Sequence, residues 1–186
     1  MNDPRDIFQT CVDAAAAAGL DFLVIGGHAV NAHGFIRTTT DFDFLLASRD
    51  LRAWREVLED AGYRLVAPER PIRAFAQFEP REPGGLRVDL MLVDDTTFAK
   101  LVVGSEWLEV GHRRVRVIGA LHLIALKLHA LQAPHRVEMG VDYLDIVQLV
   151  RLKQIDIASA EFEQMLNRYA SPAIRERLQR DFERPL

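Results

Sequence analysis

The chain has little cysteine: Cys11 is the only one among its 186 residues. A single cysteine cannot form an internal disulfide, and no cysteine–histidine spacing typical of a zinc site is present. This usage is typical of a reducing compartment, which indicates a cytoplasmic location. Long hydrophobic runs are also missing, since none approaches the roughly 20 residues of a transmembrane helix. The polar first residues lack the pattern of a signal peptide, so we expect neither a membrane span nor a secretory leader.

The chain also lacks a large excess of either acidic or basic residues. The 23 basic and 27 acidic residues leave a net charge of -4. This excludes a strong overall field that attracts nucleic acid or an anionic membrane. Arg113, Arg114 and Arg116 can still form a local basic face, either as a solvated strand edge or as a contact for an acidic acceptor such as RNA. The length fits one domain with a helical appendage.

The most informative stretch covers residues 22–46 and reads FLVIGGHAVNAHGFIRTTTDFDFLL. Its first four residues are apolar and predict a short buried strand that ends at Gly26 and Gly27. A helix is expected to start at His28. Glycine at a strand-to-helix turn lets backbone N–H groups approach a phosphate, so this turn is a candidate phosphate-binding site.

Two aspartates lie in the second strand of this stretch, predicted over residues 41–46. Because alternate side chains of a strand share a face, Asp41 and Asp43 point the same way. Asp89 lies in a later apolar strand over residues 86–93. Three carboxylates on adjacent strands can hold two Mg²⁺ ions about 3.5–4 Å apart. An Asp-x-Asp pattern alone is also typical of a solvated strand face, and the glycine pair upstream favours the metal site.

The remaining elements follow from apolar periodicity, capping residues and turn residues. The first two thirds of the chain mix strands and helices, and the last third is helical. Trp54 and Trp107 are expected in the core. We predict helices from Asp3-Pro4 to Gly19, from a Ser48 cap to Gly62, and over 120–132, 141–152, 159–169 and 172–182, strands over 64–66, 74–78, 106–110 and 114–118, and a loop marked by Pro68 and Pro71.

The chain resembles the nucleotidyltransferase superfamily of the DNA polymerase β type, which has a glycine pair, an Asp-x-Asp and a later third carboxylate. Within it, the chain is most similar to the AbiEii/AbiGii-type toxin nucleotidyltransferases and their minimal relatives. Those carry Gly-Gly-x-Ala, then His-Gly, then Arg-x-Thr-x-Asp-x-Asp, and later a helix lysine and an Asp-x-x-Asp helix. The matching residues here are Gly26, Gly27, Ala29, His33, Gly34, Arg37, Thr39, Asp41, Asp43, Lys127, Asp142 and Asp145.

The resemblance implies an α+β fold with a nucleotidyltransferase-type mixed β-sheet flanked by helices over residues 1–118, and a C-terminal helical region over 119–186 packed on that core. It also implies an Mg²⁺-dependent enzyme that uses a nucleoside triphosphate. By this resemblance the metal ligands are Asp41, Asp43 and Asp89. The other catalytic residues are Lys127 and Asp145, and the nucleotide-binding residues are Gly26, Gly27, His28, Arg37, Thr39 and Asp142.

Several of these residues also have structural interpretations. Lys127 can extend to solvent from the edge of its helix. Asp142 and Asp145 can compensate the dipole at a helix N-terminus. Arg37 can pair with a surface carboxylate, and His28 and His33 can serve helix packing or capping.

The acceptor of the nucleotidyl group stays open. The resemblance implies a toxin of a toxin–antitoxin system that modifies tRNA or another macromolecule and has an antitoxin protein as partner. A small-molecule, antibiotic-type nucleotidyltransferase is the alternative. A catalytically weak, nucleotide-binding regulatory module of the same fold is a third interpretation, and the complete set of three carboxylates argues against it.

Overall fold

The computed structural model describes residues 6–66 and 74–183 of the chain. The chain divides into two compact units: an α/β unit comprising Met1–Ala32 and Ile36–Ile118, and a helical unit comprising His33–Phe35 and Gly119–Leu186. The predicted helix start at Asp3-Pro4 and the loop at Pro68 and Pro71 lie outside the described residues. Among the described residues, no helix combines the length and apolar character that crossing a membrane requires.

The α/β unit is built on a mixed sheet, in which the described strands follow the order β3-β4-β5-β2-β1-β7-β6. The central strand β2 (Asp41–Ala47) runs parallel to β5 (Arg87–Val93) and antiparallel to β1 (Leu23–Val24). The mixture of parallel and antiparallel pairs with flanking helices confirms the predicted α+β class. The other strands are β3 (Tyr63–Leu65), β4 (Phe75–Pro80), β6 (Glu106–Val110) and β7 (Arg113–Val117).

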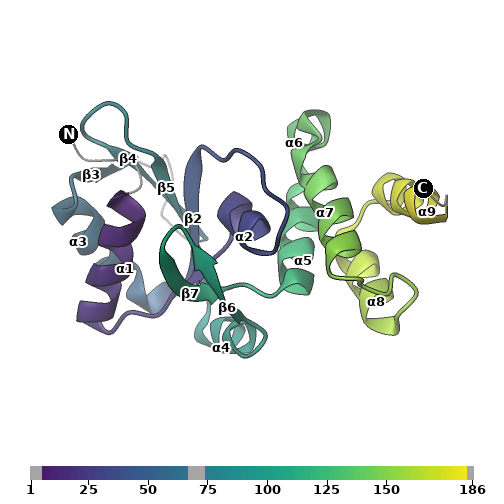
Figure 1. The fold of residues 1–186 in the computed structure, drawn as a ribbon, viewed down its shortest axis with the longest axis horizontal. Helices are drawn as coiled ribbons and strands as arrows, with labels where there is room; N and C mark the ends of the chain where they lie inside the picture. The colour runs from purple at the N-terminus through teal and green to yellow at the C-terminus, as the bar shows by residue number, and fades with distance from the viewer. Residues whose placement is uncertain (1–5, 67–73, 184–186) are drawn as a thin grey trace. The chain divides into compact units, whose positions relative to one another are not determined.

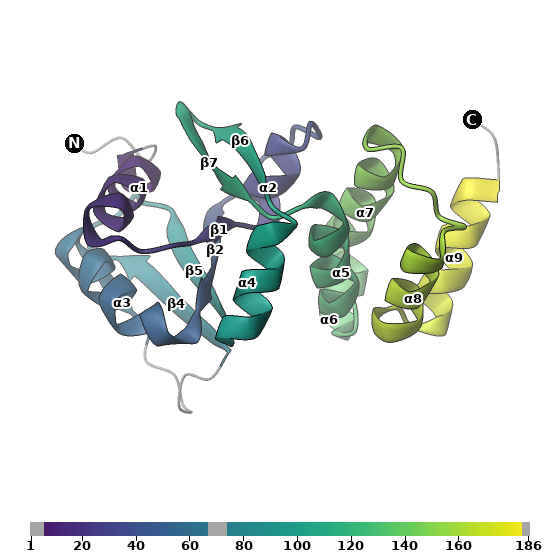
Figure 2. The ribbon, with the colours of Figure 1, turned by 90° about the horizontal axis from the view of Figure 1, so that it is seen from below.

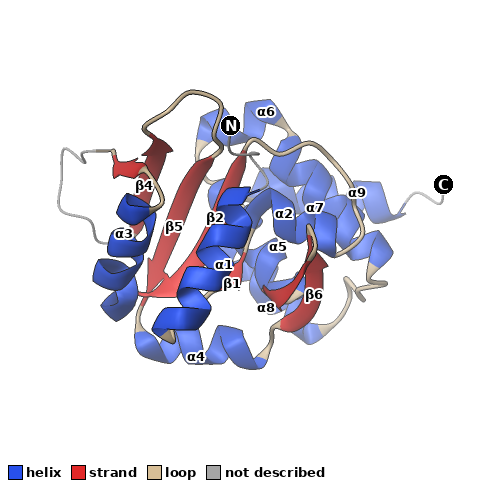
Figure 3. Ribbon diagram, turned by 60° about the vertical axis from the view of Figure 1, so that its left-hand side comes forward, coloured by secondary structure: helices blue, strands red, loops and turns tan. Residues whose placement is uncertain are grey.

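Side-chain alternation along β2 divides the sheet into an aromatic face and a carboxylate face. Phe42 and Phe44 pack against aromatic side chains of helices α1 (Asp6–Ala18) and α3 (Leu51–Asp60). Both helices lie on the same side of the sheet (Figure 3). Their rings pack with ring centroids 5.3 Å apart for Phe8–Phe42 and 5.6 Å apart for Phe44–Trp54. Helix α4 (Asp95–Val103) lies on the opposite side of the sheet (Figure 2). The aspartates of β2 therefore point away from the aromatic core.

The helices differ from the sequence prediction in three places at or near their starts. Helix α2 (Gly26–Ala32) begins at Gly26 and includes both glycines in its first turn. Helix α4 was not predicted, although Asp94 caps it by accepting a hydrogen bond from the Thr97 backbone N–H at 2.8 Å. Ser48 does not cap α3, because a short 3-10 helix η1 (Ser48–Asp50) precedes that helix and the Ser48 hydroxyl donates to the Val93 carbonyl.

The core prediction is right for Trp54 and wrong for Trp107. The Trp54 side chain is fully buried, whereas Trp107 is 52% exposed. The reason is topological: Trp107 lies on β6, which is the last strand of the sheet order and therefore an edge. Its ring is covered by the Arg116 guanidinium, 4.9 Å from the ring centroid, rather than by the core.

The two tryptophans predict a clear difference in stability. Trp54→Ala is expected to lower the free energy of unfolding by about 3–5 kcal/mol, because a large buried side chain leaves a cavity. Trp107→Ala serves as the matched control and is expected to cost well under about 1 kcal/mol, as for other exposed positions. Chemical denaturation monitored by circular dichroism measures both. Equal losses in the two variants would contradict the edge position of Trp107.

The helical unit contains helices α5 to α9 among its described residues (Figure 1). Helix α5 packs against α7 and α8, and its Ile124 is fully buried, as are Ile146 and Leu149 of α7. Ser159 caps α8 by accepting a hydrogen bond from the Phe162 backbone N–H, and α6 was not predicted. That these helices pack on the sheet remains a prediction. Their bounds are α5 (Ala120–Ala130), α6 (Pro134–Met139), α7 (Val141–Leu152), α8 (Ala160–Tyr169) and α9 (Pro172–Glu183).

Candidate active site

The three predicted metal ligands lie together on the carboxylate face of the sheet. Strands β2 and β5 pair in parallel, with Asp43 beside Asp89 and Asp41 beside Arg87. One carboxylate oxygen from each of the three aspartates lies within 4.8 Å of the others. This arrangement arises because two short apolar strands carry aspartates at alternating positions and then align in register.

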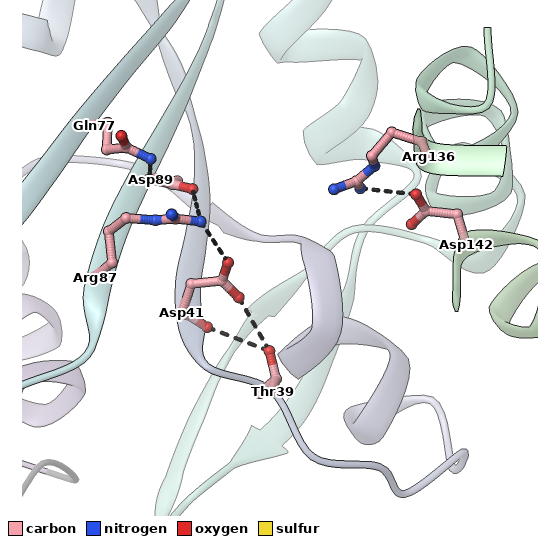
Figure 4. Close-up of polar contacts among 7 residues, drawn as sticks. All are labelled: Thr39, Asp41, Gln77, Arg87, Asp89, Arg136 and Asp142. Carbon is pink, nitrogen blue, oxygen red and sulfur yellow. Dashed lines mark hydrogen bonds and ion pairs between the residues drawn. The ribbon is translucent and has the colours of Figure 1, made fainter. Parts of the chain in front are cut away.

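Neighbouring side chains hold two of these carboxylates in place (Figure 4). The Arg87 Nη2 atom donates to Asp41 Oδ2 at 2.9 Å and lies 3.1 Å from Asp89 Oδ2. The remaining oxygens also accept hydrogen bonds, Asp41 Oδ1 from the Thr39 hydroxyl at 3.2 Å and Asp89 Oδ1 from Gln77 Nε2 at 3.1 Å. Gln77 and Arg87 were not predicted as site residues. The Arg87-x-Asp89 spacing indicates in the sequence that both side chains lie on one face of β5. The proximity of Gln77 instead depends on the pairing of β4 with β5.

The electrostatics of this cluster suit a hard cation. Asp89 is buried, and this burial raises the pKa of its carboxyl above the ordinary value, against the opposing effects of the Gln77 hydrogen bond and the Arg87 charge. A buried carboxylate among other carboxylates is unfavourable without a nearby cation. Carboxylate oxygens are the ligands that Mg²⁺ prefers. The donor set of the three aspartates therefore fits a divalent metal of this kind.

The two glycines bring the first turn of α2 directly against the carboxylate strand. Gly26 has a φ of +62°, and a Cβ atom there would lie 1.8 Å from Asp43 Oδ2. A Cβ atom on Gly27 would lie 2.4 Å from the Thr39 hydroxyl oxygen. Glycine is therefore required for packing as well as for any phosphate contact. The first turn of α2, with its backbone N–H groups, is thereby placed beside Asp43 and Thr39.

Arg37 and His28 have defined structural contacts. The Arg37 backbone is fixed by Asn31, whose side-chain amide donates to the Arg37 carbonyl and accepts from its N–H, both at 2.9 Å. The His28 ring stacks on Phe42 with a centroid distance of 4.2 Å. Burial lowers the pKa of His28, and the nearby Asp41 charge opposes that shift. These contacts support the packing interpretation of His28, while its contact with nucleotide stays a prediction.

Lys127, Asp142 and Asp145 form a second cluster, inside the helical unit. Lys127 Nζ lies 2.6 Å from Asp145 Oδ2 and 3.1 Å from Asp142 Oδ1. Asp142 also pairs with Arg136, at 2.8 Å between Oδ2 and Nη2 (Figure 4). The Lys127 side chain is only 6% exposed, so it does not extend to solvent from a helix edge. Two cations and two anions thus form a charge-balanced, largely buried network.

Comparison with known proteins supports the fold. No protein-family model and no curated protein sequence matches the chain. Among solved structures, it aligns with ANT(2'')-Ia in complex with adenylyl-2''-tobramycin at a TM-score of 0.62 and 18% identity, over 93% of this chain and 97% of that one. It also aligns with the lincomycin-bound lincosamide antibiotic adenylyltransferase LnuA at a TM-score of 0.54 and 16% identity, over 80% and 96%. The chain has the nucleotidyltransferase fold.

A further structure with this fold is an antigenic nucleotidyltransferase-like protein from Paracoccidioides brasiliensis, with a TM-score of 0.57 and 16% identity over 92% of this chain and 88% of that one. These alignments confirm the fold that the glycine pair and the aspartates predict. A particular closeness to the AbiEii/AbiGii-type toxins stays a prediction, as do the individual roles of the site residues.

Proposed function

We propose that the protein is an Mg²⁺-dependent nucleotidyltransferase that moves a nucleotidyl group from a nucleoside triphosphate to an acceptor hydroxyl. The observation that carries this proposal is the cluster of Asp41, Asp43 and Asp89 on paired strands of the nucleotidyltransferase fold. Such a cluster is not explained by the stability of the sheet, because three carboxylates within a few ångströms repel one another.

Some residues of the α/β unit would bind the metal, and others would bind the phosphate groups. Asp41, Asp43 and Asp89 would hold the divalent metal, which when bound neutralises phosphate charge and activates the attacking hydroxyl. Thr39 and Gln77 each fix one oxygen of a metal-binding carboxylate, which keeps the ligands oriented. The first-turn N–H groups of α2, at Gly26 and Gly27, and the Arg37 guanidinium bind phosphate oxygens.

The remaining residues that the resemblance assigns to the reaction lie in the helical unit. Asp142 and Asp145 hold Lys127, whose charge offsets the negative charge on the triphosphate or the leaving pyrophosphate. Asp145, which is fully buried, orients Lys127. In this scheme the protein catalyses mainly by positioning and charge stabilisation, as is general for phosphoryl transfer.

Two acceptor classes are proposed. The resemblance to AbiEii/AbiGii-type toxins favours tRNA or another macromolecule, with an antitoxin partner. The alignments with ANT(2'')-Ia and LnuA, solved with adenylyl-2''-tobramycin and lincomycin, favour a small-molecule acceptor. Incubating the protein with each labelled nucleoside triphosphate and Mg²⁺, together with total RNA, an aminoglycoside or a lincosamide, decides between them. Labelled RNA supports the first class and a labelled antibiotic supports the second.

The glycine pair gives a prediction for nucleotide binding. Gly27→Val places a side chain where the Thr39 hydroxyl lies, so it displaces Thr39 and blocks phosphate from the backbone of α2. We expect triphosphate affinity to fall at least about tenfold, in line with the loss of a charge-assisted hydrogen bond. Calorimetric titration with a non-hydrolysable triphosphate measures the affinity.

The matched control for this variant is Ala17→Val, which introduces the same β-branched side chain at an exposed position of α1. It is expected to bind nucleotide like the parent. Circular dichroism should show similar helix content in both variants. If Gly27→Val binds nucleotide as tightly as Ala17→Val does, the phosphate contact at Gly27 is wrong.

A further inference from the structure

The Arg87 guanidinium lies between two of the proposed metal ligands, Asp41 and Asp89. Its Nη2 atom contacts Asp41 Oδ2 at 2.9 Å and Asp89 Oδ2 at 3.1 Å, so one nitrogen bridges two of the three carboxylates (Figure 4). The register of the strands causes this, because Arg87 lies beside Asp41 and two residues before Asp89 on the same face. The bridge joins adjacent strands at the metal cluster itself.

Arg87 contacts the Oδ2 atoms of Asp41 and Asp89, whereas the hydrogen bonds from Thr39 and Gln77 go to the Oδ1 atoms. Asp41 Oδ1 accepts from Thr39 and Asp89 Oδ1 accepts from Gln77, which leaves the two Oδ2 atoms for a cation. A guanidinium and a divalent metal on the same oxygens repel each other. A metal that binds both Oδ2 atoms must therefore weaken or displace the Arg87 contacts.

Arg87 is also better placed to move than the carboxylates are. Its side chain is 42% exposed, whereas that of Asp89 is 7% exposed. The long arginine side chain can swing to solvent, while the short Asp89 side chain is fixed on β5. A displaced guanidinium needs a new anion, and a bound triphosphate provides one in planar, bidentate geometry.

We propose that Arg87 competes with the divalent metal for Asp41 and Asp89 in the free protein and moves onto a phosphate group when metal and triphosphate bind together. The proposal deepens the nucleotidyltransferase function proposed above and rests on it. Arg87 thereby makes metal binding weak without nucleotide and couples the two ligands. Because such coupling is reciprocal, the metal strengthens triphosphate binding by the same factor.

The test measures metal binding without nucleotide. Arg87→Met removes the charge and keeps much of the side-chain length, and Arg87→Lys keeps the charge. Calorimetric titration with Mn²⁺ alone is expected to show binding at least about tenfold tighter in Arg87→Met than in the parent, within the usual range of coupling between ligands. Arg64→Met is the matched control, since Arg64 lies on the same sheet and pairs with Glu79, and its Mn²⁺ affinity is expected to stay at the parent value.

The second measurement is triphosphate binding at saturating Mg²⁺. Arg87→Met is expected to bind a non-hydrolysable triphosphate about tenfold more weakly than the parent, because a phosphate contact is lost, whereas Arg87→Lys retains most of the affinity. Arg87→Met is thus expected to strengthen Mn²⁺ binding and to weaken triphosphate binding. A variant that only disturbed the fold would weaken both kinds of binding.

The outcomes separate this inference from the proposed function. Mn²⁺ affinity that is unchanged or weaker in Arg87→Met, with normal Mg²⁺-dependent triphosphate binding by the parent, overturns the role of Arg87 alone. Unchanged triphosphate affinity overturns the phosphate contact. If Arg87→Met does not fold, Arg87→Gln, which keeps N–H donors without the charge, must show the same tighter Mn²⁺ binding. Binding of neither Mn²⁺ nor triphosphate by any form, parent included, overturns the proposed function itself.

Discussion

Asp43→Asn is expected to abolish nucleotidyl transfer while the protein stays folded. Asp43 lies directly beside Asp89 on paired strands, and its carboxylate belongs to the cluster within 4.8 Å. An amide ligates Mg²⁺ more weakly than a carboxylate does and leaves more phosphate charge uncompensated. Loss of one charge-stabilising group typically lowers the rate about a hundred- to a thousandfold, and loss of a metal ligand is expected to reach the upper end of this range or beyond. Transfer assays with the labelled triphosphate measure the effect.

The stability of the same variant provides an independent readout. Asp43 is one of several carboxylates that repel one another, so in metal-free buffer Asp43→Asn is expected to melt at or above the temperature of the parent. Added Mg²⁺ with a triphosphate is expected to stabilise the parent and not the variant. The control is Asp95→Asn on α4, whose partner Arg49 and own side chain are both 59% exposed, so it should change neither activity nor melting temperature appreciably. Full activity in Asp43→Asn would remove the carboxylate cluster from catalysis.

The positions of the three aspartates could be predicted from the sequence because local rules decide them. Alternation along two short apolar strands places Asp41 and Asp43 on one face and puts Asp89 on a similar face of its own strand. In the observed register of the parallel strands β2 and β5, Asp43 and Asp89 then lie beside each other. Local pattern and global topology agree here, which is why the sequence was sufficient.

The surroundings of the aspartates could not be predicted in the same way. Gln77 reaches Asp89 because β4 pairs with β5, and that contact depends on topology rather than on local spacing. The exposure of Trp107 likewise depends on β6 being an edge strand. Helix α4 is not predicted, although the sequence has Asp94 at a position suited to a helix cap and the apolar Phe98, which the structure buries, four residues later. The tight packing of Gly26 and Gly27 against Asp43 and Thr39 adds a packing reason for glycines that the sequence predicts to bind phosphate.

Lys127→Met is expected to lower both turnover and stability, because Lys127 is buried with its partners. Asp145 is fully buried and lies 2.6 Å from Lys127 Nζ, so removal of the lysine charge takes away a cation that compensates a buried carboxylate. Breaking such a pair typically costs about 3–5 kcal/mol of unfolding free energy. If Lys127 also contacts phosphate, turnover falls about a hundred- to a thousandfold beyond any effect of partial unfolding. Turnover must therefore be measured well below the melting temperature of the variant.

The double variant Lys127→Met/Asp145→Asn separates a catalytic lysine from a purely structural one. It removes both charges, so no buried carboxylate is left unpaired at Asp145, and a buried amide costs less free energy than a buried unpaired charge. Denaturant unfolding is expected to show most of the lost stability regained. Turnover is expected to stay low, because the cation that offsets phosphate charge is still absent. Recovery of turnover together with stability would place Lys127 and Asp145 in the scaffold of the helical unit and exclude them from the reaction.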